Sequence, residues 1–134
     1  MANALYAKAK QAFLSKQIDL LNDTIKATLV DSADYTLDIA NHDFIDDVPA
    51  GARVATVTLS GKSVTGGVFD AADATFSSVT GDQCEYIIIW QDTGTESTSR
   101  LIAIIDTATG LPITPNGADI NIVWDNGANK IFAL

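Results

Sequence analysis

The sequence predicts a mostly β protein, an antiparallel β-sandwich or jelly-roll-like barrel of about eight short strands with one short N-terminal helix. Two observations predict it: apolar and β-branched stretches are short, and Gly, Pro, Asn and Asp residues separate them at regular intervals. Apolar residues make up 47% of the chain and charged residues 19%, which favours a globular domain over disorder. With 134 residues, we expect a single domain over 1–134, with 1–22 as a helix or arm and 23–134 as the β body.

The N-terminal helix is predicted over residues 4–16, with Asn3 as its N-cap. A narrow apolar stripe recurs there at helical spacing and consists of Leu5, Ala9, Ala12 and Phe13. Such a stripe packs a helix on a sheet or docks it on a partner. Four lysines against two aspartates give residues 1–26 a net charge of +2, whereas four basic against fifteen acidic residues give 27–134 a net charge of −11.

In the first half of the chain, a period of two and β-branched runs predict several short strands. Residues 31–47 hold six Asp residues and are expected to form a loop, and Ser60-Gly61-Lys62 is expected to be a hairpin connection. The predicted strands are 24–30, 53–59, one that begins at Ser63, and 74–77.

The strongest strand signal is the pair Glu85–Trp90 and Leu101–Ile105, joined by a polar segment that contains Gly94. We expect an antiparallel pair. Neither strand alternates apolar with polar residues, so both faces must be covered. A second sheet is expected on one face, and the N-terminal helix or a neighbouring subunit on the other.

The C-terminal segment predicts a hairpin, because Asn126-Gly127 is the favoured two-residue type I′ turn. This turn would place opposite each other residues whose numbers sum to 253. The pairs expected on one face are Ile120 with Ala133, Ile122 with Ile131, and Trp124 with Asn129.

Composition excludes several functional classes. A formal net charge of −9 argues against nucleic-acid partners, which require a basic surface. One Cys and one His leave no internal disulfide and no zinc site of several Cys or His ligands, and we expect no cofactor. The longest apolar runs have five residues where a membrane helix needs about 20, so we expect no membrane partner and synthesis in a host cytoplasm.

No candidate for catalysis is specific, and we do not expect an enzyme. Gly61-Lys62-Ser63 resembles the end of a phosphate-binding loop, but Thr56 stands where its first Gly is required. His42 could join a nucleophile such as Cys84, yet no nucleophile elbow is present, and Cys84 begins an apolar strand as an inert residue. The Asp residues of 31–47 could bind Ca²⁺, but they lack its loop spacing and favour a solvated acidic loop.

Four segments resemble a family of small virion structural proteins of tailed bacteriophages: ALYAKAKQAFL, DTIKATLVDSADYTL, VPAGARVAT and the run from Asp92 to Leu134 that begins DTGTESTSRLIAII. The resemblance spans nearly the whole chain. It implies a capsid decoration, or cement, protein on the outer surface of the head. Such a protein would form a homo-oligomer, commonly a trimer, and would bridge major capsid proteins.

On this interpretation, five residues are predicted to contact protein partners: Leu5, Lys8, Phe13, Trp90 and Trp124. The two Trp residues end apolar strands, where they are core or rim anchors, and Trp is enriched in interfaces. The main alternative function is a tail or baseplate component or a receptor-binding adhesin. A glycan hydrolase and a carbohydrate-binding module are further alternatives, the latter if Trp90 and Trp124 formed an exposed coplanar pair.

Overall fold

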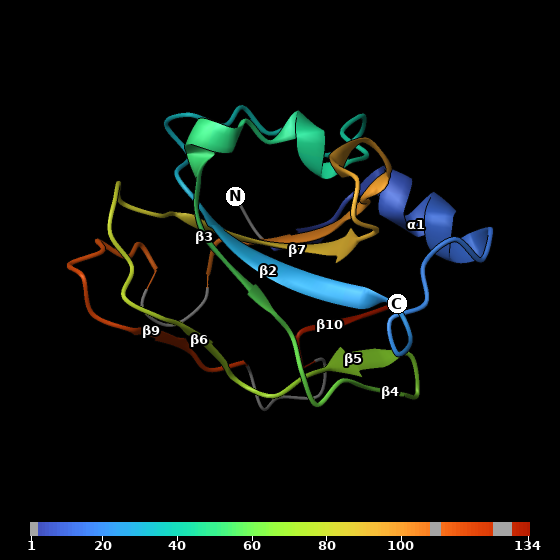
Figure 1. The fold of residues 1–134 in the computed structure, drawn as a ribbon. Helices are drawn as coiled ribbons and strands as arrows, with labels where there is room; N and C mark the ends of the chain where they lie inside the picture. Colours follow the sequence, from blue (N-terminus) through green and yellow to red (C-terminus); the bar gives the residue numbers. More distant parts are fainter. Residues whose placement is uncertain (1–2, 108–110, 125–129) are drawn as a thin grey trace.

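The structure is a computed structural model that describes residues 3–107, 111–124 and 130–134. Within them the chain forms ten strands, one α-helix and three 3₁₀ turns, which confirms the mostly β fold with one short N-terminal helix (Figure 1). In chain order the elements are β1 (Ala4–Leu5), α1 (Ala7–Leu14), β2 (Thr24–Val30), η1 (Ile45–Asp47), η2 (Ala50–Ala52), β3 (Arg53–Thr58), β4 (Ser63–Thr65), β5 (Val68–Asp70), β6 (Ala74–Phe76), β7 (Tyr86–Asp92), η3 (Glu96–Thr98), β8 (Leu101–Ile105), β9 (Ile120–Ile122) and β10 (Phe132–Ala133).

The strands form three antiparallel sheets. The largest has five strands in the order β1-β8-β7-β2-β3, and the others are β10-β5-β4 and β6-β9. In Figure 1 the two small sheets lie on one side of β2 and β7, whereas η1 and η2 lie on the other. Helix α1 packs against β8. The arrangement is a β-sandwich-like domain in which the five-stranded sheet forms one layer and the two small sheets form the other.

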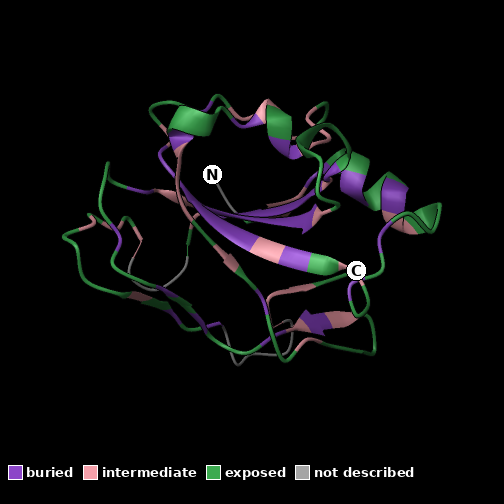
Figure 2. Cartoon of the chain, viewed as in Figure 1, coloured by how far each residue is buried: buried purple, intermediate pink, exposed green. Residues whose placement is uncertain are grey.

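The apolar hairpin forms as expected, with β7 and β8 paired antiparallel and Ile88 opposite Ile104. Every residue of β8 is buried, and the buried residues concentrate in β2 and β7 (Figure 2). The loop between β2 and η2 contributes buried side chains to the cover, among them Tyr35, Ile45 and Val48. One chain therefore covers both faces of this hairpin, and the N-terminal helix, one of the two covers expected for the second face, packs against β8.

The predicted strand 24–30 matches β2, but the predicted hairpin at Ser60-Gly61-Lys62 is wrong. Strand β3 pairs with β2 and β4 pairs with β5, so these residues connect two sheets. The seven-residue β2 offers β3 a longer and more apolar partner than the three exposed residues of β4 do. Glycine at position 61 allows the chain to pass from one sheet to the other, because its φ of +61° is strained for other residues and a Cβ there would lie only 3.2 Å from Cβ of Ala72.

The predicted C-terminal hairpin register is also wrong. Strand β9 pairs with β6, with Ile120 opposite Phe76, and β10 pairs with β5, with Phe132 opposite Phe69. The turn predicted at 126–127 lies outside the described residues. An isolated two-stranded hairpin is only marginally stable, whereas these pairings place both segments beside strands with buried Phe side chains.

The N-terminal helix is shorter than predicted, because Ala4–Leu5 pairs with β8 as a strand and α1 begins only at Ala7. Asn3 is therefore not its N-cap. Its side-chain oxygen accepts hydrogen bonds from the backbone N–H of Asp106 and Thr107, at 2.9 and 3.2 Å, and fastens the segment to the end of β8.

Candidate functional site

An exposed apolar groove beside the C-terminal end of α1 is the candidate site for a protein partner. Its volume is about 330 Å³. Its wall contains Leu21 and Val64, which are 51% and 43% exposed. We call it the apolar groove, and its lining is Phe13, Lys16, Ile18, Asp19, Leu20, Leu21, Val64 and Leu134. Large apolar side chains left in water at one place mark surfaces that bind other molecules.

The end of α1 shapes one wall of the apolar groove. The backbone N–H of Lys16 donates to the Phe13 carbonyl at 3.2 Å, and that of Gln17 to the Ala12 carbonyl at 2.8 Å. This pair of bonds is a Schellman motif, with Lys16 in the left-handed position at φ 63°. The motif stops the helix and turns the chain, so that Phe13 stays at the groove while the following residues run along its rim.

A hydrogen-bonded turn holds Leu21 in its exposed position. One carboxylate oxygen of Asp19 accepts from the backbone N–H of Leu21 and of Asn22, at 3.1 and 3.3 Å. The Asn22 side chain donates to the other oxygen at 2.6 Å and lowers the pKa of Asp19. Leu20 is buried at 8% exposure, so the turn buries one leucine of the pair and exposes the other.

Three of the predicted interface residues lie at the surface near α1. Phe13 is half-buried and lines the apolar groove, and its ring centroid lies 6.3 Å from that of Phe132. Lys8 is exposed and lines a separate polar pocket. Leu5 is half-buried and pairs with Ala103 in the sheet. The structure thus brings only Phe13 of these three to the apolar groove.

Both predicted Trp residues are buried within the chain, at 8% and 6% exposure for Trp90 and Trp124. The Trp90 Nε1–H donates to Oγ1 of Thr28 at 2.8 Å, and that of Trp124 donates to the Ala72 carbonyl at 3.0 Å. A buried indole keeps its N–H satisfied in this way. The rings therefore pack in the core of this chain, and they do not form an exposed pair for stacking a sugar.

His42 and Cys84 have structural partners. Nδ1 of His42 lies 2.8 Å from the Tyr35 hydroxyl, which in turn lies 3.0 Å from the Tyr6 hydroxyl. Burial is the main cause that raises the pKa of Tyr35 to about 12. Burial also raises the pKa of Cys84 to about 11, which keeps its thiol protonated at neutral pH and unsuited to nucleophilic attack.

Three of the six Asp residues in 31–47, namely Asp31, Asp38 and Asp47, accept hydrogen bonds from nearby backbone N–H groups. Asp38 accepts hydrogen bonds from the side chain and backbone of Asn41, and Asp47 accepts from the backbone N–H of Asp43 at 2.8 Å. Carboxylate oxygens of Asp31, Asp34 and Asp82 lie within 4.8 Å of one another, a spacing that could hold a cation. Exposed carboxylates also gather without a cation, so the cluster alone defines no metal site.

Acid should destabilise the protein through four carboxyl groups whose pKa is lowered by hydrogen bonds, namely Asp19, Asp38, Asp92 and Glu96. A folded-state pKa below the unfolded value means that the stabilisation is complete above the unfolded value, 3.8 for Asp, and is lost as the pH falls through the folded value. We expect a lower Tm at about pH 3 than at about pH 6, at constant ionic strength. Asp38→Asn should reduce that difference.

Asp43 opposes this trend, because burial and its neighbour Asp47 raise its pKa, so its own contribution favours the folded state at lower pH. With one group against four, we expect the net change to be a loss of stability in acid. A Tm that stays constant between the two pH values, or an Asp38→Asn variant with the wild-type difference, would contradict the assignment of these carboxyl groups.

Sequence reasoning missed Leu21 and Val64. Leu21 adjoins Leu20 in the sequence, and no periodicity tells which of the two faces water, since their turn is set by Asp19. Val64 lies in the short strand β4, and its strand partner β5 could not be read from local pattern.

Comparison with known proteins found no family model that matches this chain and no matching curated protein. Within the part of the chain that the structure describes, no helix has the length and apolar character needed to span a membrane.

Proposed function

We propose that this protein is a structural component of a tailed-bacteriophage virion, a decoration protein on the outer surface of the head that bridges major capsid proteins as a homo-oligomer. The observation that carries the proposal is the apolar groove, a surface on which Leu21 and Val64 are exposed to water and could be buried by contact with another protein. The resemblance of the sequence to small phage virion proteins supports it. The apolar side chains of the core are covered within the chain, which suits a compact unit that associates through its periphery.

The energetics of such a surface suit repeated attachment. Burying an apolar side chain of this size contributes about 1.5–3 kcal/mol relative to full exposure, and partly exposed side chains contribute less. One groove alone therefore gives modest affinity. An oligomer that engages several capsid subunits at once gains affinity without new contacts, because the second and later contacts form within one complex.

Replacing Leu21 and Val64 together by Asp should abolish binding to expanded empty capsids. Two charges in the groove would have to be desolvated on contact, which is unfavourable when no opposite charge pairs with them. Val123→Asp is the matched control, since Val123 is 59% exposed and does not line the groove. Co-sedimentation with capsids measures the effect, and the midpoint of urea unfolding shows whether the variants remain folded.

Wild-type binding by the double variant, or an equal loss in Val123→Asp, would contradict the role of the groove. Light scattering tests the oligomer, and a strict monomer that does not bind capsids would count against a decoration protein. Cryo-electron microscopy of the virion distinguishes the main alternative, since density for the chain on the tail would assign it to a tail or baseplate component.

A further inference from the structure

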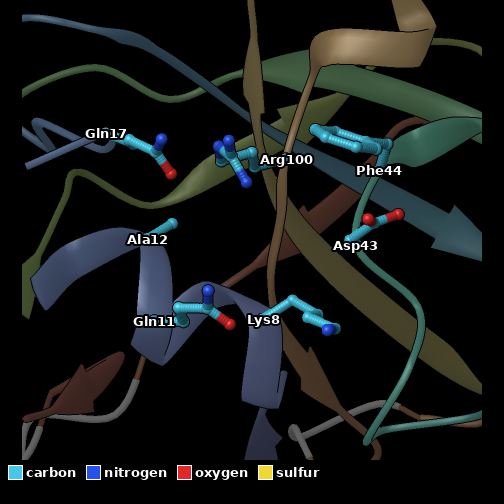
Figure 3. Close-up of a pocket in the computed structure, with 7 residues that line it drawn as sticks. All are labelled: Lys8, Gln11, Ala12, Gln17, Asp43, Phe44 and Arg100. Atoms are coloured by element: carbon cyan, nitrogen blue, oxygen red, sulfur yellow. The ribbon is translucent and has the colours of Figure 1, made fainter. Parts of the chain in front are cut away.

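A polar pocket of about 320 Å³ lies between α1 and the segments that precede η1 and β8 (Figure 3). It is separate from the apolar groove and shares no lining residue with it. Its lining is Lys8, Gln11, Ala12, Gln17, Asp43, Phe44 and Arg100. The pocket therefore combines two cations, two amides and one carboxylate around a small space.

Arg100 is held in place by the chain segment opposite. Phe44 and Arg100 form an isolated antiparallel bridge, fixed on either side by backbone hydrogen bonds from Ile45 to Ser99 and from Leu101 to Asp43, at 2.8 and 2.9 Å. Residues directly opposite in such a bridge have their side chains on the same face. The Arg100 guanidinium accordingly stacks over the Phe44 ring, 5.1 Å from its centroid.

The cationic and amide side chains of the pocket keep their hydrogen-bond donors available within the described part of the chain. Over residues 3–107, 111–124 and 130–134, neither the Arg100 guanidinium nor the Lys8 ammonium makes a hydrogen bond or an ion pair, and the side-chain amides of Gln11 and Gln17 make none. In Figure 3 these side chains surround the same space. A guanidinium already positioned by stacking loses less conformational freedom when it binds a ligand.

We propose that this pocket binds a carboxylate group, with the Arg100 guanidinium as the principal contact and with Lys8, Gln11 and Gln17 as further donors. The planar fork of a guanidinium matches a carboxylate in a bidentate arrangement. The formal charges of Lys8, Arg100 and Asp43 leave the pocket with +1, which complements one carboxylate but not a phosphate dianion. The inference does not rest on the proposed function, because it concerns a different surface.

Asp43 sets the strength of this site. Asp43 lines the pocket, and its burial and the neighbouring Asp47 raise its pKa, as expected for a negative charge in an unfavourable environment. Asp43→Asn removes a charge that repels the ligand and should tighten binding. A site for a cation or for a neutral ligand would respond in the opposite way or not at all.

The test is an NMR titration of the ¹⁵N-labelled full chain with sodium acetate against sodium chloride at the same ionic strength. We expect saturable shifts of the Arg100, Gln11 and Gln17 side-chain signals, with a Kd on the order of millimolar. Arg100→Gln should raise Kd about tenfold or more, Lys8→Gln less, and Asp43→Asn should lower it. Lys10→Gln is the matched control, because Lys10 is exposed on α1 and does not line the pocket.

Arg100→Lys serves as a second variant in case Arg100→Gln fails to fold, since it keeps the charge and loses the planar fork, and we expect an intermediate Kd. Shifts that increase linearly without saturation would overturn the proposal. So would a Lys10→Gln effect as large as that of Arg100→Gln, or an affinity for inorganic phosphate above that for acetate.

Two further probes distinguish the source of the carboxylate. One is a short blocked peptide with a single Glu between Gly and Ser residues, and the other is the same peptide with Gln. Tighter binding of the Glu peptide than of acetate supports an acidic side chain of a protein as the ligand. Equal affinities support a free small carboxylate, and binding of the Gln peptide as tight as that of the Glu peptide would overturn the site.

Discussion

Deletion of residues 2–14 should leave a chain that no longer unfolds cooperatively. This segment contributes Tyr6, Ala9 and Ala12 to the core, each at 1% exposure or less. The backbone N–H of Tyr6 donates to the Ile102 carbonyl at 3.0 Å, and β1 is hydrogen-bonded to β8. Loss of one buried aromatic side chain alone costs about 3–5 kcal/mol, against about 5–15 kcal/mol for a whole domain. Removal of the helix as well should bring the free energy of unfolding of the remaining chain close to zero.

Urea unfolding followed by tryptophan fluorescence measures this effect, and Lys8→Gln with Lys10→Gln serves as a control that changes only exposed side chains of the same segment. The deletion also tests whether 1–22 is an arm. A truncated chain with the wild-type unfolding midpoint that no longer bound capsids would show that the segment acts as an arm and not as part of the folded core.

Ile88→Ala should cost about 3–4 kcal/mol of unfolding free energy. Ile88 is fully buried in β7, the middle strand of the large sheet, where it stands between Thr28 of β2 and Ile104 of β8. Strands on both sides fix the backbone, so the cavity can close only by small side-chain movements. The slope of urea unfolding should stay the same while the midpoint falls.

The control for this prediction is Val123→Ala, at a side chain that is 59% exposed. Its unfolding free energy should change by less than about 0.5 kcal/mol. A cost below about 1.5 kcal/mol for Ile88→Ala would mean that the sheet around it repacks, and that the two-sided cover of β7 is looser than its burial indicates.

The sequence predicts the fold class and the central strands because their signal is local. Residues 24–30 alternate, and the two apolar runs flank a short polar segment that contains Gly94, which favours their pairing with each other. Strand pairing at the C-terminal end depends instead on side chains far away in the chain. Phe69 and Phe76 provide the buried neighbours of β10 and β9, and a turn signal at 126–127 carries no information about them.

The candidate sites were harder to predict for the same reason. Nothing in the local sequence of Arg100 reveals that it stacks on Phe44, since an isolated bridge between distant segments joins them. For Trp90, the sequence does not distinguish a core anchor from an interface residue. Its chemistry suits an interface, but Thr28 on the neighbouring strand satisfies its N–H and keeps the ring inside.

Because β7 and β8 are covered within one chain, folding of the core is separate from association with other proteins. The apolar sheet is buried without a contribution from a second protein, so association need not supply any part of this core. Under the proposed function, attachment to the capsid would depend on concentration and on the number of simultaneous contacts, and it would be reversible without unfolding of the chain. Under that proposal, the protein would be added to a capsid shell that is already assembled.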